Sequence, residues 1–244
     1  MKQTTDALII RENNNIGEAD RFVTALTRDF GVVQASVRGA RRIKNHNGPA
    51  TQLLCYSRLS LYRGRDKYIV DDAEPLRVFF EVRNQLDKLA LAQYFCELAG
   101  ALAPREEPAE DALRLLLGGL HYLATDTRSI PLIKAVVELR LLTLAGYMPQ
   151  LTVCNGCASE QVTHFSPVQG VLSCDGCRTP SSLPITAGVL SALRHIVYVP
   201  LDKCFSFSLS QEGLQMLSTL CERFLLAQLD RGFKTLDFYR SIQV

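Results

Sequence analysis

Four of the eight cysteines form two Cys-x-x-Cys pairs, Cys154-Asn155-Gly156-Cys157 and Cys174-Asp175-Gly176-Cys177, with sixteen residues between them. A Cys-x-x-Cys turn can direct two thiolates at one ion, and a second turn across a small hairpin completes a tetrahedron. The spacing is that of a four-cysteine zinc ribbon. Four sulfur ligands leave no open position for water, so we expect one structural Zn²⁺ ion and not a catalytic one.

The Asn-Gly and Asp-Gly steps inside these pairs suit turns that need a positive φ, which glycine adopts at little cost. The alternative for the pairs is redox chemistry, but two motifs at ribbon spacing favour the metal. His164 lies between the two pairs and is surplus to a complete four-sulfur site. We expect it to be a surface loop residue.

The remaining cysteines, Cys55, Cys96, Cys204 and Cys221, sit in apolar stretches and are expected to be small buried hydrophobic residues. No apolar signal-peptide core follows Met1, and no uncharged apolar run reaches the roughly 18 residues that cross a bilayer. We therefore expect a cytoplasmic, nucleoid-associated protein that makes no membrane contact, in a compartment where disulfides are rare.

Positive charge is concentrated between Phe30 and Arg65, a stretch without any Asp or Glu. Its basic residues are Arg38, Arg41, Arg42, Lys44, Arg58, Arg63 and Arg65. The whole chain has a formal net charge of only +2, so the N-terminal region carries most of the positive field. Such a field attracts polyanions, which indicates a nucleic-acid surface. An ordinary solvated basic face is the alternative that charge alone leaves open.

The first eighty residues show the two-residue period of β-strands. Candidate strands cover residues 7–12, 21–28, 32–38, 51–62 and 68–70, and residues 39–49 are predicted to form a mobile basic loop. Five short antiparallel strands suit a small closed barrel, for which the OB-fold is the common nucleic-acid-binding example.

The period changes to about 3.6 near Pro75, and apolar stripes of helical spacing follow over residues 112–123, 133–144 and 214–225. Residues 85–103 are apolar on nearly all sides and predict a buried helix. The fold class is therefore a multidomain α+β protein. We expect an OB-fold domain over 1–79, a helical domain over 80–149 and 181–244, and a zinc-ribbon insert over 150–180.

Motifs typical of enzymes are not found: the sequence contains no Walker A loop, GxGxxG, HExxH or GxSxG. Its acidic residues are scattered and form no obvious carboxylate pair. We therefore expect a non-enzymatic protein.

With these features in place, the chain resembles the RecO family of bacterial recombination mediators over essentially its whole length. The resemblance rests on five stretches in order, namely Gly17–Arg21, Asp29–Val33, Val37–Arg42, Leu144–Pro149 and Phe233–Leu236. It implies an OB domain, a helical domain and a zinc ribbon. It also implies binding of single- and double-stranded DNA, annealing of complementary strands and, with RecR, loading of RecA onto strands coated by single-stranded-DNA-binding protein, whose acidic C-terminal tail is a further partner. The stretch Lys44–Asn47 departs from the more basic loop of the family.

Candidate DNA contacts come from the basic region. Phosphate contacts supply affinity without reading sequence, which suits annealing. The candidates are Arg21, Arg28, Arg38, Arg41, Arg42, Lys44, Arg58, Arg63 and Arg65. Phe22, Tyr56 and Tyr62 are candidates for stacking on bases, although each fits a core position equally well.

Three other functions fit parts of the sequence. A protein-interaction scaffold would use the helical grooves and the ribbon for partners, and a titration with nucleic acid at several salt concentrations distinguishes it. A redox-controlled chaperone would release zinc on oxidation, but it does not explain the basic N-terminal third. A zinc-ribbon transcription factor would bind DNA sequence-specifically.

Overall fold

The computed structural model describes residues 2–13, 20–42, 44–64 and 67–243. The chain divides into two compact units, and each is described by itself. Unit 1 contains Met1–Ala124 and Phe233–Val244, and unit 2 contains Thr125–Gly232. Unit 1 thus joins the barrel to several helices, and the three-part division into barrel, helical domain and insert stays a prediction. No helix within the described ranges combines the length and apolarity needed to cross a membrane.

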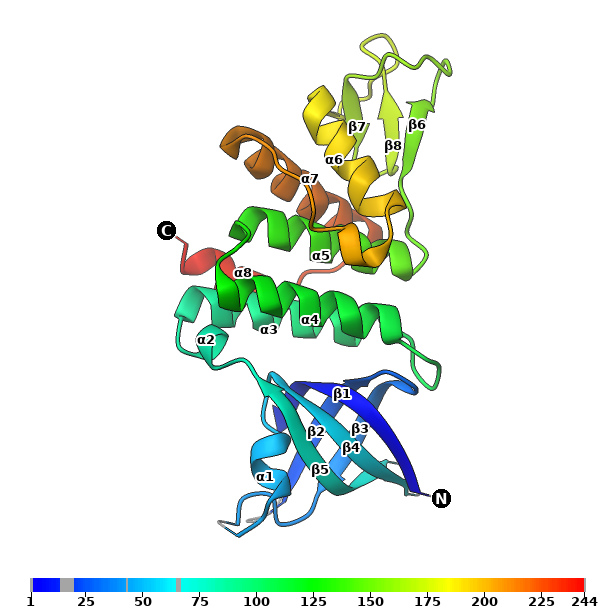
Figure 1. Cartoon of the computed structure of the whole chain (residues 1–244). Helices are drawn as coiled ribbons and strands as arrows, with labels where there is room; N and C mark the ends of the chain where they lie inside the picture. The colour runs from blue at the N-terminus through cyan, green and yellow to red at the C-terminus, as the bar shows by residue number, and fades with distance from the viewer. Residues whose placement is uncertain (1, 14–19, 43, 65–66, 244) are drawn as a thin grey trace. The chain divides into compact units, whose positions relative to one another are not determined.

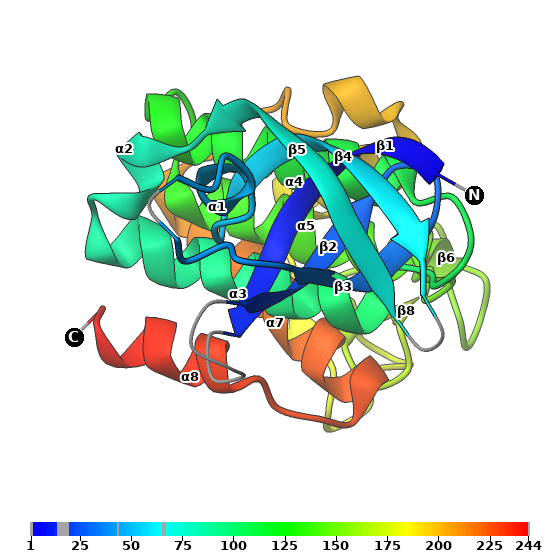
Figure 2. The ribbon, with the colours of Figure 1, turned by 90° about the horizontal axis from the view of Figure 1, so that it is seen from below.

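Unit 1 contains a closed five-stranded barrel with the strand order β1-β2-β3-β5-β4 (Figure 1). The strands are β1 (Lys2–Asn13), β2 (Arg21–Thr27), β3 (Gly31–Val37), β4 (Cys55–Arg63) and β5 (Tyr68–Val78). β1 pairs with both β2 and β4, which closes the barrel. The short helix α1 (Asn47–Ala50) lies between β3 and β4 in the chain and beside the barrel in both views (Figures 1 and 2). This confirms the OB-type barrel.

Two details of the predicted barrel were wrong. The prediction made all strands antiparallel, whereas β3 and β5 pair in parallel, so the barrel is mixed. The last strand also continues beyond residue 70 to Val78 and passes through Pro75. Proline removes one donor from a ladder and is tolerated at bulges. The β4–β5 register shifts between Tyr56 and Ser57, and Pro75 stands opposite Ser57 at this bulge.

The barrel core follows from the period of two in the strands. Val33, Ala35 and Val37 are buried, while Gln34 and Arg38 between and after them are exposed. Leu59 and Leu61 on β4 also face the core. The predicted alternation in the third and fourth strands is therefore confirmed, and it leaves the intervening side chains on the outer surface.

Four helices complete unit 1: α2 (Phe80–Arg83), α3 (Leu86–Leu102), α4 (Glu110–Thr125) and α8 (Lys234–Ser241). α3 is buried over most of its length, as its sequence predicted, and the apolar stripe of α4 is buried from Ala112 to Leu123. The Phe233 ring meets Tyr94 of α3 edge-on at 5.9 Å between centroids. The chain therefore returns to unit 1 at its C-terminal end.

The connector between α3 and α4 is bound to the barrel. Val32 N–H donates to the carbonyl of Pro104, and Glu106 N–H donates to that of Phe30, at 2.9 and 3.1 Å. Gly31 has φ +64°, and a Cβ there would stand 2.1 Å from the Pro104 oxygen. Only glycine fits this close approach of two backbones.

Unit 2 combines helices with a small sheet. Its helices are α5 (Ile130–Leu144), α6 (Ala187–Tyr198), the 3₁₀ helix η1 (Leu201–Lys203) and α7 (Gln211–Leu229). Its strands are β6 (Gln150–Cys154), β7 (His164–Ser166), β8 (Val171–Ser173) and β9 (Leu183–Pro184), in the order β6-β8-β7-β9. The buried Lys134 ammonium lies 2.7 Å from carboxylate oxygens of both Glu138 and Glu222, which links α5 to α7. The prediction of helices interrupted by a cysteine-bearing sheet is confirmed.

Candidate nucleic-acid interface and metal centre

The two Cys-x-x-Cys turns meet because β6 and β8 are parallel neighbours. Cys154 is the last residue of β6, and Cys174 follows directly after β8, whose Leu172 pairs with Cys154. Adjacent parallel strands end at the same edge of a sheet, so both turns begin side by side. Before β6, Gly146 at φ +93° ends α5, where Tyr147 N–H donates to the Leu142 carbonyl. The parallel pairing replaces the simple hairpin that the spacing suggested.

The four thiols converge closely enough to hold one metal ion. The sulfur atoms of Cys154, Cys157, Cys174 and Cys177 all lie within 4.8 Å of one another. Cys174 Sγ is 3.8 Å from Cys154 Sγ and 3.7 Å from Cys157 Sγ. A tetrahedron with metal–sulfur bonds of about 2.3 Å has sulfur–sulfur edges of about 3.8 Å. The distances therefore fit a tetrahedral thiolate site.

The surroundings of the sulfurs favour thiolate at one position and thiol at another. Backbone N–H groups, above all that of Cys174 at 3.4 Å, lower the pKa of the Cys154 thiol to about 6. Hydrogen bonding with the neighbouring sulfur of Cys174 raises the pKa of Cys177 to about 12. Four sulfurs this close cannot all ionise unless a cation compensates their charge.

Glycine is needed in the first turn for space and not for a positive φ. Positive φ values occur at Ala158 but at neither Gly156 nor Gly176, so the conformational reason predicted for these glycines was wrong. A Cβ added at Gly156 would stand 2.9 Å from Cys177 Sγ, whereas one added at Gly176 would meet nothing within 4 Å. Gly156 therefore allows the two turns to pack together.

The position of His164 also differs from the surface loop that was predicted for it. It lies in β7 and is buried, with Nδ1 2.8 Å from the Thr163 hydroxyl and 3.5 Å from an Asp175 oxygen. It belongs to the sheet that supports the cysteines and is not a surface loop residue. Cys55, Cys96, Cys204 and Cys221 are all buried, as predicted.

The residues between β3 and α1 form a hydrogen-bonded turn, here called the basic turn (residues 38–46, with 43 outside the described ranges). Asn45 Nδ2 donates to the Arg38 carbonyl at 2.8 Å. Asn47 donates to the Asp71 carbonyl and accepts from Ala73 N–H, which fixes the turn to β5. The asparagines that depart from the family pattern thus build the turn, and the described part is not the open loop that was predicted.

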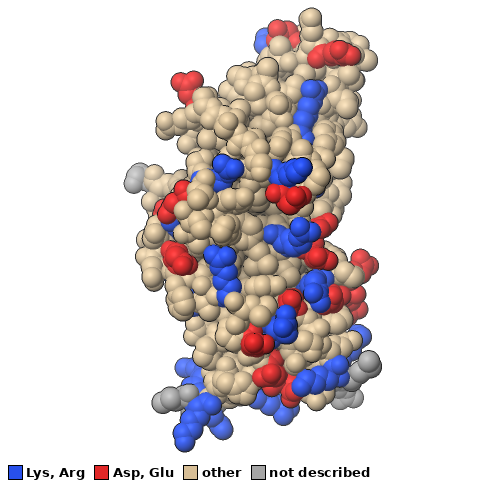
Figure 3. Space-filling model, in the orientation of Figure 1, with Lys and Arg blue, Asp and Glu red and all other residues tan. Residues whose placement is uncertain are grey.

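The basic residues of the basic turn are exposed, although two carboxylates bond to other groups of the turn: Asp20 accepts from Gly39 N–H at 2.7 Å, and Asp72 pairs with His46 at 2.9 Å. Arg38, Arg41, Arg42 and Lys44 are all exposed. Among the described residues, no carboxylate forms an ion pair with Arg38, Arg42 or Lys44. Figure 3 shows basic side chains projecting without acidic neighbours from the end of the barrel where α1 lies. Positive charge at this turn remains available to an external anion.

The cations on the barrel wall are paired instead. Arg58 Nε lies 3.0 Å from Asp6 Oδ1, and Arg28 lies 3.7 Å from the other oxygen of Asp6 and 3.1 Å from Asp29. Hydrogen bonds from Arg28, and then from Thr5, hold the pKa of Asp29 below its usual value. We call Arg28, Arg58, Asp6 and Asp29 the Asp6 cluster. Its charges largely cancel within the protein.

The other predicted contacts have separate environments. Arg21 is 9% exposed and donates to the Gly48 carbonyl at 2.8 Å, so it braces the barrel against α1. Arg63 pairs with Glu106 at 3.5 Å. Arg65 lies outside the described residues.

The candidate stacking residues are all on the barrel. Phe22 is half-buried on β2, with Lys67 Nζ 4.5 Å from its ring centroid. Tyr62 is 41% exposed on β4. Tyr56 is half-buried, and burial raises the pKa of its hydroxyl. Lys67 was missed from the sequence, because nothing local shows that it reaches a ring on another strand.

Comparison with known proteins identifies the family of the chain. The family model for the N terminal of recombination protein O matches residues 1–79, and that for its C terminal matches residues 83–237. The chain belongs to the RecO family. A "DNA repair protein RecO" of Acetivibrio thermocellus is 33% identical over 242 residues, which cover 98% of this chain and 96% of the relative. A second "DNA repair protein RecO", from Desulforudis audaxviator, is 33% identical over 249 residues, which cover 100% of this chain and 99% of the relative.

The RecO-family stretches quoted from the sequence have structural roles. Asp29–Val33 contains the β2–β3 turn and the Gly31 contact, and Leu144–Pro149 carries the Gly146 helix end before β6. Phe233–Leu236 returns the chain to α3. In the first stretch, residues 17–19 lie outside the described ranges.

Proposed function

We propose that this RecO-family chain is a non-enzymatic DNA repair and recombination mediator that binds single- and double-stranded DNA and anneals complementary strands. The observation that carries the proposal is the basic turn, where Arg38, Arg42 and Lys44 are exposed on an OB-type barrel and have no ion pair among the described residues. Annealing brings two polyanions together, so neutralising phosphates while bases stay accessible lowers its barrier.

The basic turn, with Arg41 among its basic residues, is the primary phosphate-binding surface in this proposal. The Asp6 cluster has a lesser part, since its cations must leave carboxylates before they can contact phosphate. Arg21 is omitted because its guanidinium is buried and hydrogen-bonded to Gly48. Phe22 and Tyr62 provide aromatic surface on the barrel wall for stacking.

The four cysteines hold one structural Zn²⁺ ion in this proposal. The sulfur spacing and the all-thiolate donor set support zinc. Bound there, the ion ties the ends of β6 and β8 together and compensates the charge of the thiolates. DNA contact does not require it.

Family membership supports the wider assignment. In this account the chain acts with RecR and with single-stranded-DNA-binding protein, through the acidic tail of the latter, and so assists the loading of RecA. A protein-interaction scaffold without DNA binding is the competing account, and it predicts no salt-dependent affinity for DNA.

The test is annealing of two complementary oligonucleotides without nucleotide. We expect the parent chain to accelerate annealing and the variant Arg38→Glu/Arg42→Glu to lose most of this acceleration. The matched control is Arg114→Glu/Arg223→Glu, which changes the same charge on exposed helical positions. Equal annealing by the parent and the basic-turn variant, with folding intact in both, would rule out the basic turn.

A further inference from the structure

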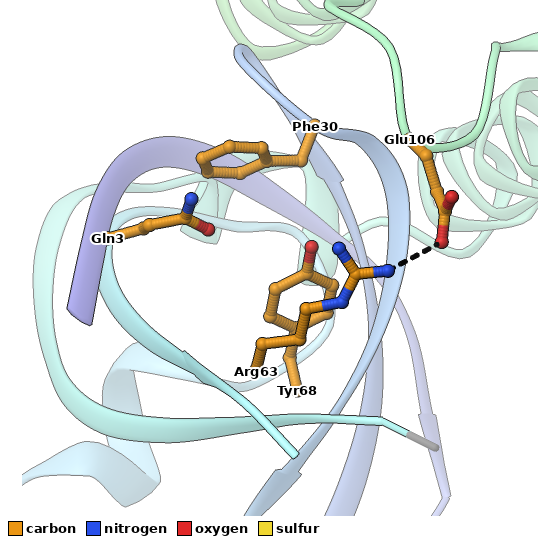
Figure 4. Close-up of a pocket in the computed structure, with 5 residues that line it drawn as sticks. All are labelled: Gln3, Phe30, Arg63, Tyr68 and Glu106. Atoms are coloured by element: carbon orange, nitrogen blue, oxygen red, sulfur yellow. Dashed lines mark ion pairs between the residues drawn. The ribbon is translucent and has the colours of Figure 1, made fainter. Parts of the chain in front are cut away.

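A cavity of about 290 Å³ lies at one end of the barrel (Figure 4). It is lined by Gln3, Phe30, Arg63, Tyr68 and Glu106, all of which belong to unit 1. In Figure 4 the side chains of Gln3, Phe30 and Arg63 are directed toward a common space beside the Tyr68 ring. This is separate from the basic turn, which lies next to α1.

The strand period explains why these side chains meet. Gln3 precedes the buried Thr5 and Ala7 on β1, and Arg63 follows the buried Leu59 and Leu61 on β4. Alternate residues share a face, so Gln3 and Arg63 belong to the inward faces of their strands, and at the end of the barrel the Arg63 side chain is 71% exposed at the rim. The cavity is therefore the mouth of the barrel, a common place for ligand sites.

The mouth has flat apolar walls. The Phe30 and Tyr68 rings are stacked with centroids 6.3 Å apart and planes at 28°, and both pack on the barrel core. Aromatic rings of this kind offer their faces to other planar groups. A planar ring system is the shape that such walls bind best.

The polar groups of the mouth have no net charge. Arg63 Nη2 lies 3.5 Å from Glu106 Oε1, so a donor and an acceptor stand side by side at the rim, with the Gln3 amide as a third group. One cation and one anion give no net attraction for phosphate. They do match the adjacent donors and acceptors on the edge of a nucleobase.

We propose that the barrel mouth binds one unpaired nucleobase of a DNA strand that is held by the basic turn. This inference rests on the proposed function and adds to it a base subsite outside the phosphate-binding surface. The base stacks on Phe30 and Tyr68, and its edge bonds to Arg63, Glu106 and Gln3. At about 290 Å³ the cavity lies just below the roughly 300–1,000 Å³ of pockets for drug-sized ligands, so it suits one ring system and nothing larger.

The subsite and the basic turn lie at opposite ends of one strand. Phe30 precedes β3 and Arg38 follows it, so eight residue steps of about 3.3 Å separate them by about 26 Å. Between them, Lys67 next to Tyr68 reaches the Phe22 ring on β2. Exposed Gln34 and half-buried Ser36 line the outer face of β3. Along this face the protein would contact several nucleotides of one DNA strand, as OB folds commonly do.

Photocrosslinking tests the inference directly. A single-stranded thymine oligonucleotide carrying one 5-iodouracil is bound to the full chain, irradiated and digested, and the modified residues are identified by mass spectrometry. We expect crosslinks at Phe30 or Tyr68. Crosslinks confined to other aromatic residues, with binding through the basic turn intact, would overturn this inference alone. A chain that binds no oligonucleotide at any salt concentration would overturn the proposed function as well.

Affinity and its salt dependence give a second readout. Phe30→Leu is expected to weaken binding at least about fivefold without changing the salt slope, because stacking releases no counterions. Tyr198→Leu, at an aromatic residue of α6 that is 53% exposed, is the matched control. Unchanged affinity in a folded Phe30→Leu protein would contradict the subsite.

A third test uses Glu106→Gln, which changes an exposed side chain and, unlike Phe30→Leu, leaves the packing of the barrel core untouched. The new side-chain amide keeps an acceptor oxygen and releases Arg63, so we expect affinity for the oligonucleotide to rise about two- to threefold at low salt. Glu107→Gln removes the same charge one position away, where no described cation forms an ion pair with the carboxylate. Equal effects of the two changes would show only a general charge effect and would overturn the role given to Arg63.

Discussion

The four-cysteine cluster and the basic turn each gather four functional groups, but they hold them in opposite ways. The thiols converge within 4.8 Å of one another at the edge of a sheet, so they share one small partner. The cations of the basic turn are exposed and point outward, so they suit a long partner with repeated charges. Short-range coordination and long-range electrostatics thus divide between two units of the chain, so we expect that either site can be disrupted while the other keeps its function.

The largest effect is expected from breaking the metal centre. Cys174→Ser removes a ligand, so we expect the zinc content to fall from about one ion per chain toward zero and Tm to drop by several degrees, since metal binding contributes to folding. DNA affinity should change little. Metal analysis and thermal unfolding measure this, with Glu160→Gln, at an exposed residue between the two cysteine pairs, as a nearby non-ligand control. Stoichiometric zinc in Cys174→Ser would show that the ligands are assigned wrongly.

A matched glycine pair sharpens the account of the cluster. Gly156→Ala places a Cβ 2.9 Å from Cys177 Sγ, and Gly176→Ala places one in open space. We expect a cost of about 1–3 kcal/mol for the first and nearly none for the second. Chelator competition and thermal unfolding compare the two. Equal losses would contradict the packing reason for Gly156.

The Asp6 cluster offers a way to turn paired cations into available ones. Asp6→Asn removes the carboxylate that binds Arg28 and Arg58, so we expect slightly lower stability, by about 1 kcal/mol or less. DNA affinity should rise a few-fold at low salt, and the salt slope should steepen. Asp202→Asn, at an exposed residue of η1, controls for net charge. Unchanged binding would mean that the barrel wall lies outside the DNA path.

The smallest effect concerns pH. The pKa of Asp29 is lowered in the folded chain, so its carboxylate contributes stability that is present above its unfolded pKa of about 4 and lost as pH falls through the folded value. Asp29→Asn should therefore destabilise the protein near neutral pH, and this loss should become smaller as the pH falls below about 4. Denaturant unfolding at a series of pH values measures the free energy of unfolding. An equal loss of stability at acidic and at neutral pH would show that the titration of Asp29 does not contribute to the pH dependence.

The metal centre could be predicted from the sequence because its geometry is local. Cys-x-x-Cys spacing sets two ligands within one turn, and only the parallel pairing of β6 and β8 had to be learned from the structure. The strand and helix periods likewise predicted most elements. Pro75 suggested an early end to β5, and only the bulge opposite Ser57 shows why the strand continues.

The electrostatic surface could be predicted only in part. Counting charges treats Arg58 and Arg42 alike, yet Arg58 pairs with Asp6, which is 52 residues earlier in the chain. Arg21 reads as another cation but is buried against α1. The barrel mouth shows the same limit. Glu106 reaches Arg63 only because the connector docks on the β2–β3 turn.

The salt dependence of single-stranded DNA affinity tests the central claim most directly. If Arg38, Arg41, Arg42 and Lys44 each neutralise a phosphate, log K should fall with log salt concentration at a slope of about −3 in the parent. Arg38→Glu/Arg42→Glu should make this slope shallower, with a magnitude of about 1.5 or smaller. Arg114→Glu/Arg223→Glu should leave the slope unchanged. The same slope in the parent and the basic-turn variant would contradict the account.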